Sequence, residues 1–136
     1  MPFTCKLIDH TADVGFEIEA SSLNELFKAA AIATFEVMAD LKKVSPKISK
    51  KIELENEKLD QLLFNFIEEL IFLKDAKSML FSKFKVGIKE AEKKVYLTAE
   101  IKGEKINIKK HDLKVDVKAI TFHEFYVKKL NDKWKA

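Results

Sequence analysis

The sequence predicts an α/β two-layer sandwich, with two long helices packed on one largely antiparallel or mixed β-sheet. Three observations favour this class. Short segments alternate apolar and polar residues, which is typical of half-buried strands. Two longer segments repeat apolar residues every three or four positions, which indicates amphipathic helices. Each helical segment follows a strand, and a run of strands completes the chain, so we expect the helices to cover one face of the sheet.

The expected strands are short and separated by polar turns. Alternation predicts strands in residues 3–8, 14–20, 48–54, 79–88 with a break near Ser82, 95–101, and a short edge strand at 106–108. Gly103-Glu104 predicts a turn before that edge strand, and residues 109–114 a polar loop. Residues 115–130 carry apolar side chains of both parities, which is typical of a central strand buried on both faces.

Two capping signals place the helices. Ser22 and Glu25 match a capping box, and the apolar spacing that follows predicts a helix that ends near residues 40–43, because Ser45-Pro46 prevents its continuation. Asn56 is the expected cap of the second helix. That helix is apolar over most of its circumference between residues 59 and 73. It must therefore lie beneath other elements or supply a docking surface for another protein.

Composition limits the classes of protein to consider. With 136 residues, the chain is expected to be one domain spanning residues 1–136. Its 25 basic residues, all Lys, are interspersed with 22 acidic ones, so a net charge of +3 favours a solvated surface over direct nucleic-acid binding. Cys5 is the single cysteine and has no disulfide partner, and no leader or membrane-length apolar run is present, so we expect a cytoplasmic protein.

The densest group of reactive side chains lies at Asp9-His10-Thr11-Ala12-Asp13, immediately before an expected strand. Asp9 and Asp13 are oxygen donors suited to Ca²⁺ or Mg²⁺, although two carboxylates do not fill the shell of such a cation. The alternative is that Asp13 accepts backbone N–H groups of its own loop. His10 has no second histidine at zinc spacing, so a structural role is favoured for it.

Lys118 and His123 lie in the segment Val117-Lys118-Ala119-Ile120-Thr121-Phe122-His123. A buried ammonium without a partner is costly, so Lys118 either emerges at a sheet edge or meets a carboxylate. In a regular strand, Lys118 and His123 point to opposite faces, so a bulge is needed to bring them into one site. With only 3 Gly, the chain has no phosphate-binding loop or nucleophile elbow, which argues against independent group-transfer catalysis.

These motifs together resemble the archease family. The resemblance rests on the segment from Asp9 to Gly15, on the helix motifs Leu23-Asn24-Glu25-Leu26-Phe27 and Phe35-Glu36-Val37-Met38-Ala39-Asp40, on Leu62-Leu63 with Glu68-Glu69-Leu70, and on residues 117–123. It covers almost the whole chain. The first and last motifs are specific in combination, whereas the helix motifs alone are weak.

The resemblance implies an accessory protein of tRNA splicing that promotes guanylylation and multiple turnover of an RtcB-type RNA ligase, reaches tRNA only indirectly, and is not itself an enzyme. It also implies a divalent-metal site, commonly Ca²⁺, shared by Asp13 and an aspartate at the extreme C-terminus. Lys118 matches a functionally required lysine, and His10, Asp40 and His123 are further expected contact residues. The printed chain has no counterpart of the C-terminal aspartate, so either its C-terminus is clipped or its metal site is incomplete. An incomplete site predicts weaker metal binding, because the cation loses both charge and a ligand.

Two other classes of function remain open at this point. One is a chaperone-like module that modulates RNA-processing enzymes through the apolar surface of residues 64–73. The other is a small metal-dependent hydrolase that uses His10, Asp13 and His123.

Overall fold

The computed structural model describes residues 3–9, 14–36, 38–106, 127–130 and 133–135. The elements in chain order are β1 (Phe3–Asp9), β2 (Val14–Ala20), α1 (Leu23–Glu36), the 3₁₀ turn η1 (Leu41–Lys43), β3 (Ile48–Asn56), α2 (Leu59–Lys77), β4 (Met79–Ala91), β5 (Lys94–Lys105), β6 (Lys128–Leu130) and β7 (Lys133–Lys135). The predicted class is confirmed, because two long helices pack on antiparallel strands.

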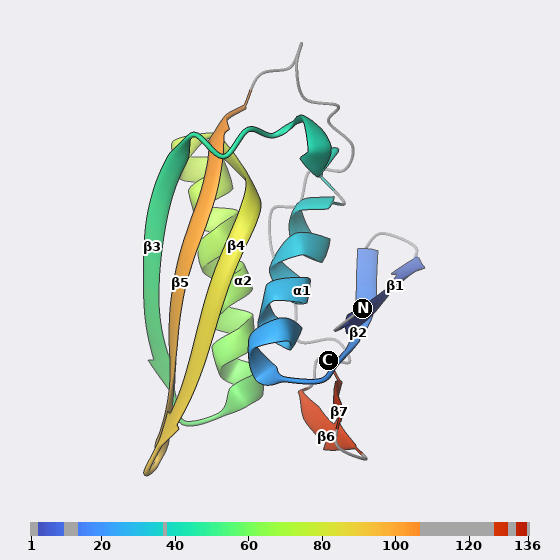
Figure 1. Cartoon of the computed structure of the whole chain (residues 1–136), viewed down its shortest axis with the longest axis vertical. Helices are drawn as coiled ribbons and strands as arrows, with labels where there is room; N and C mark the ends of the chain where they lie inside the picture. Colours follow the sequence, from blue (N-terminus) through green and yellow to red (C-terminus); the bar gives the residue numbers. More distant parts are fainter. Residues whose placement is uncertain (1–2, 10–13, 37, 107–126, 131–132, 136) are drawn as a thin grey trace.

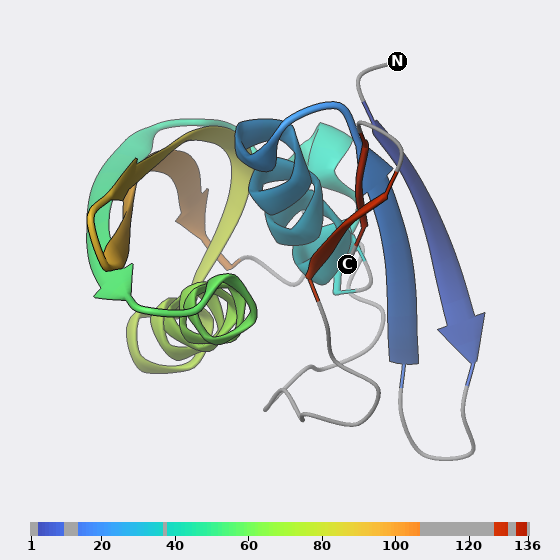
Figure 2. The same cartoon turned by 90° about the horizontal axis from the view of Figure 1, so that it is seen from below.

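The described strands divide into two sheets where the sequence analysis expected one. One sheet has the order β1-β2-β7-β6 and the other the order β3-β5-β4, and all the strand pairs in them are antiparallel. Helix α1 lies between the two sheets and contacts β4 on one side and β1, β2 and β7 on the other (Figures 1 and 2). Among the described elements, α1 thus contacts both sheets.

The composition of α1 explains this central position. Its alanines at positions 29, 30, 31 and 33 are at most 4% exposed, and such small side chains let strands approach the helix closely. Larger rings fill the remaining space: the ring of Phe27 stacks with that of Phe66 on α2, and the ring of Phe35 contacts those of Phe81 and Phe84 on β4. The core therefore runs from one side of α1 into the space between α2 and the three-stranded sheet.

Helix α1 begins where predicted but ends earlier than predicted. At the start, the Glu25 backbone N–H donates to Ser22 Oγ at 3.2 Å, as expected for the first half of a capping box. At the other end, α1 stops at Glu36 and does not reach residues 40–43. The backbone N–H groups of Met38 and Ala39 both donate to Phe35 O at 3.0 Å, so the chain turns there and buries both side chains.

Helix α2 covers the inner face of the β3-β5-β4 sheet and contacts α1 as well (Figure 2). The first of the two alternatives, that this helix lies beneath other elements, is thus confirmed, but Phe72 remains 54% exposed. Lys58 is the N-cap of α2, so the prediction of Asn56 as the cap was wrong. Asn56 Oδ1 instead accepts the Lys58 N–H at 3.1 Å, which forms a turn just before the helix.

The β4–β5 hairpin is longer than predicted. Strand β4 continues through Ser82 with a register shift between Phe81 and Lys83, where a break was expected. The predicted turn at Gly103-Glu104 was wrong, because both residues lie within β5. Ile106 follows the end of β5, so the part of the expected edge strand that the structure describes is not a strand. The predicted polar loop and most of the predicted central strand fall in residues 107–126, outside the described residues.

Candidate functional site

Four of the five site residues predicted from the sequence lie outside the described residues: His10, Asp13, Lys118 and His123. The structure therefore does not test whether these four come together. It does describe the strand ends on both sides of the first motif, because Asp9 at the end of β1 pairs with Val14 at the start of β2. The link between these paired ends contains His10 and Asp13.

Asp40, the fifth residue, lies in the turn that follows α1. It is the N-cap of η1, and its Oδ1 accepts the Lys42 backbone N–H at 3.1 Å. A carboxylate at this position also lies at the positive end of the short turn's peptide dipoles. Met38 and Ala39, just before it, are 3% and 0% exposed, so the turn starts from a firmly packed backbone. Asp40 thus has a structural role that is sufficient to explain its presence.

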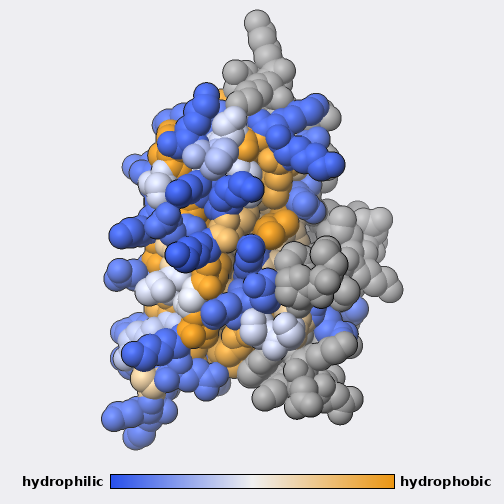
Figure 3. Space-filling view, viewed as in Figure 1, coloured by the Kyte–Doolittle hydropathy of each residue, from blue (hydrophilic) through white to orange (hydrophobic). Residues whose placement is uncertain are grey.

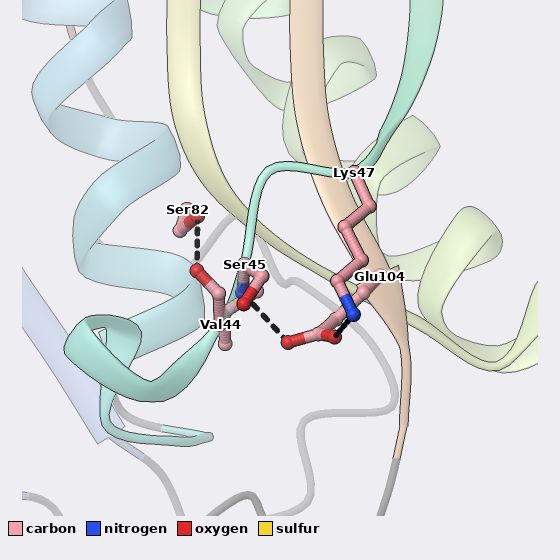
Figure 4. Close-up of polar contacts among 5 residues, drawn as sticks. All are labelled: Val44, Ser45, Lys47, Ser82 and Glu104. Atoms are coloured by element: carbon pink, nitrogen blue, oxygen red, sulfur yellow. Dashed lines mark hydrogen bonds and ion pairs between the residues drawn. The ribbon is translucent and has the colours of Figure 1, made fainter.

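The loop that follows η1 is fastened at two points to the β4–β5 hairpin (Figure 4). The Ser45 backbone N–H donates to Glu104 Oε2 at 2.6 Å, and Ser82 Oγ donates to Val44 O at 2.8 Å. Glu104 is only 8% exposed, so it is a buried carboxylate with a charge-assisted hydrogen bond. Lys47 Nζ approaches Glu104 Oε1 at 4.0 Å, but its side chain is 70% exposed and the ion pair contributes little.

A third contact joins this loop to β5 through the backbone. The Lys47 N–H donates to Gly103 O at 3.0 Å, and Gly103 then pairs with Ile48 as β3 begins. Gly103 has no room for a side chain, because an added Cβ would lie 1.8 Å from Leu80 O. We define the η1–β3 clamp as Val44, Ser45, Lys47, Ser82, Gly103 and Glu104. This clamp fixes the direction in which the Asp40 turn leaves the core.

The C-terminal strand lies beside β2. In the register of β2 and β7, Glu19 pairs with Lys135 and Ala20 with Trp134. Because the two strands are antiparallel, each residue further along β7 moves one residue back along β2, toward Val14. The direction of β7 therefore points toward the end of β2 that adjoins Asp13.

The described part of the chain also bears on two other kinds of feature, metal clusters and membrane-spanning helices. Within it, His, Cys, Asp and Glu residues form no group of three or more that could hold a metal ion. None of the described helices is both long and apolar enough to cross a membrane.

Solved structures provide the first comparison. The solution structure of Methanobacterium thermoautotrophicum protein 1598 matches with a TM-score of 0.86 and 37% sequence identity, covering 97% of this chain and 94% of that chain. The protein described here is therefore a small α/β sandwich protein with the fold of protein 1598.

Sequence comparison gives the family. The model of the Archease protein family (MTH1598/TM1083) matches residues 6–136. Proteins named "Protein archease" from Pyrococcus abyssi and Thermococcus kodakarensis are each 43% identical over 129 residues, which is 94% of this chain and 91% of each relative. The chain belongs to the archease family, as the resemblance of its motifs implied.

Sequence reasoning missed the η1–β3 clamp. Glu104 was assigned to a turn because a glycine precedes it, although that glycine is present for close packing of two strands. The strand alternation gave no signal for it, because the buried apolar positions of β5 are odd-numbered, from Val95 to Ile101, and this pattern predicts an exposed side chain at position 104.

Proposed function

We propose that this protein activates an RtcB-type RNA ligase of tRNA splicing by promoting guanylylation and multiple turnover of the ligase, and that it does not join RNA itself. Membership of the archease family carries this proposal. The family match spans residues 6–136, and this range includes the motifs that contain Asp13 and Lys118. On this proposal the protein works in the cytoplasm, the ligase is the direct partner, and tRNA is reached only through the ligase.

The proposed metal ligand is Asp13, with Ca²⁺ as the expected cation. A second carboxylate beside Asp13 would strengthen such a site. Strand β7 is antiparallel to β2 and runs toward the Val14 end of that strand, which adjoins Asp13 in the sequence. A carboxylate at that place would complete a pair of oxygen ligands, and the cation would supply positive charge near the ligase interface.

The other predicted residues are proposed contacts with the ligase. Lys118 offers a positive charge to a phosphate or an acidic group of the ligase, whereas His10 and His123 offer hydrogen bonds. Asp40 already accepts one backbone N–H through Oδ1, so its contribution is to present Oδ2 and the turn that it caps. The η1–β3 clamp supports this role because it holds the turn at a fixed place.

A guanylylation assay tests the proposal. Purified ligase is incubated with labelled GTP and Mn²⁺ or Mg²⁺, with or without this protein, and the labelled ligase is counted. We expect faster labelling with the wild type and loss of the gain with Asp13→Ala or Lys118→Ala. Glu90→Ala and Lys85→Ala are matched controls, because both side chains are exposed on β4, and they should stimulate like the wild type. Equal labelling with and without the wild-type protein would contradict the proposal.

One observation favours a second function, a chaperone-like module for RNA-processing enzymes. Phe72 is 54% exposed on α2, the helix for which the sequence predicted a docking surface. Pull-down with the wild type and with Phe72→Ser separates the two functions. Capture of many partners that depends on Phe72, without preference for the ligase, would favour the chaperone-like module.

A further inference from the structure

The two edges of the β3-β5-β4 sheet differ in how they are covered. Along the β4 edge lies α1, whose Asn24 Oδ1 accepts the Ile88 backbone N–H at 2.8 Å. At the other edge, β3 pairs with β5, and its remaining contacts among the described elements are mainly with α2 on the inner face. Figures 1 and 2 show none of these elements beyond β3. Alternate backbone N–H and C=O groups of this nine-residue strand are therefore not paired with any strand in the described part of the chain.

The outward side chains of β3 carry opposite charges on its two halves. Lys51 lies before the central Ile52, whereas Glu53 and Glu55 lie after it, and all three are exposed. Glu55 pairs with Lys94 at 3.5 Å. Lys51 and Glu53 form no ion pair with any described residue, so both charges are available to a partner. Figure 3 shows hydrophilic side chains over much of this side of the molecule.

We propose that β3 pairs with β3 of a second copy of this chain, antiparallel and with the two-fold axis at Ile52. This symmetric register places Lys51 opposite Glu53 of the second copy, and by symmetry the pair occurs twice. It also places Ser49 opposite Glu55 and Ile52 opposite its own copy. The result is one continuous six-stranded sheet across the dimer, with helix α2 of each copy on the same side.

The charges select this register over its neighbours. Residues opposite each other across such a two-fold axis must share the same parity, so the adjacent registers move the axis by one residue. An axis at Lys51 places Lys51 opposite Lys51 of the second copy. An axis at Glu53 places Glu53 opposite Glu53 of the second copy. Both alternatives place like charges directly opposite, which destabilises a strand pair. The axis at Ile52 avoids both.

Lys50 sets the strength of the association. It is half-buried on the inner side of β3, where the proposed register puts it opposite Leu54 of the second copy. An inward lysine on an edge strand disfavours pairing with apolar strands in general. The dimer is therefore weak and reversible, and it depends on the complementary Lys51 and Glu53 pairs.

Analytical ultracentrifugation of the full chain tests the proposal without any ligase. For the wild type at low salt we expect a monomer–dimer equilibrium at concentrations up to about 1 mM, the range of weak contacts. Lys51→Glu and Glu53→Lys should each weaken the dimer by roughly tenfold or more, because two attractive pairs become repulsive. Mixing these two variants in equal amounts should restore the dimer, since every opposite pair then joins Lys with Glu.

Lys85→Glu provides the control, because it lowers the net charge of +3 by the same amount as Lys51→Glu but lies on β4. It should dimerise like the wild type, and circular dichroism should show all variants folded. A wild type that stays monomeric throughout overturns the proposal. Unchanged dimerisation of Lys51→Glu and Glu53→Lys would also overturn it, as would a mixture of these two variants that stays monomeric.

Discussion

We expect Gly103→Ala to lower the free energy of unfolding far more than the addition of one methyl group usually does. Gly103 lies at the point where β5, the β4 bulge and the loop before β3 meet. A Cβ built there would lie 1.8 Å from Leu80 O, 2.7 Å from Leu80 C and 2.7 Å from Phe81 Cα. All three are backbone atoms, so no side-chain rotation can relieve the clash, and the β4–β5 ladder must open.

The magnitude follows from what must move. Overpacking in a core costs about 1–3 kcal/mol when side chains can adjust, and backbone displacement places this site at about 3 kcal/mol or more. For a domain of this length, that loss lowers Tm by about 10 °C. The separation also pulls Gly103 O from the Lys47 N–H, which is 3.0 Å away, and so loosens the η1–β3 clamp.

Gly87→Ala is the matched control for the same assay. It lies in the adjacent strand of the same sheet, and its added Cβ would meet Thr98 Oγ1 at 3.3 Å, a side-chain atom that can rotate away. We expect a change within about 1 kcal/mol, of either sign. Urea denaturation followed by circular dichroism gives both free energies of unfolding. Equal losses for the two variants would refute the reasoning from close backbone approach.

Three further predictions concern single side chains. Glu104→Ala removes the acceptor of the Ser45 N–H and should lower the free energy of unfolding by about 1.5–3 kcal/mol. Lys47→Ala should change the same free energy by less than about 1 kcal/mol. Similar losses for the two variants in urea denaturation would show that the ion pair, and not the buried hydrogen bond, holds the loop. Asn24→Ala leaves the Ile88 N–H without its acceptor and should lower the free energy of unfolding by about 1 kcal/mol. Amide exchange at Ile88, measured by NMR, should become faster. Unchanged exchange would mean that α1 does not protect this edge. Calorimetric titration should show that Asp13→Asn weakens Ca²⁺ binding. Appending an in-register strand that ends in aspartate should strengthen it, because a second carboxylate adds charge and a ligand. Equal Ca²⁺ affinities of the wild type and Asp13→Asn would remove Asp13 from the proposed site.

The sequence predicted the elements whose signals are local. Alternation located β1, β2 and β3, and the place where a break was predicted near Ser82 carries a register shift within a continuous strand. The start of α1 was also predictable, because the Ser22 side chain and the first turn of the helix are neighbours in sequence.

The rest depends on contacts between distant residues. The pairing of β2 with β7 joins the two ends of the chain, and neither strand carries a local signal of its partner. The described strands thus include a second sheet, β1-β2-β7-β6, which the sequence did not predict. The end of α1 was predicted too late in the chain. Apolar residues continue at helical spacing to Leu41, but the helix ends at Glu36 and Asp40 caps a separate turn.

The candidate site was predictable as motifs and not as geometry. Family membership, which the motifs implied, is confirmed, whereas the positions of Asp13 and Lys118 relative to each other remain predictions. The η1–β3 clamp around Glu104 could not be predicted, since it joins residues 45 and 104 through one side chain.

The most direct measurement is the number of RNA joining events per ligase molecule when this protein is present at substoichiometric concentration. Ligase, GTP, metal ion and a pair of RNA ends with the required termini are incubated, and ligated product is counted against ligase. The account predicts roughly one round of joining per pre-guanylylated ligase without this protein, many rounds with it, and a return toward one round with Asp13→Ala. The same number of rounds with and without the wild-type protein would contradict the account.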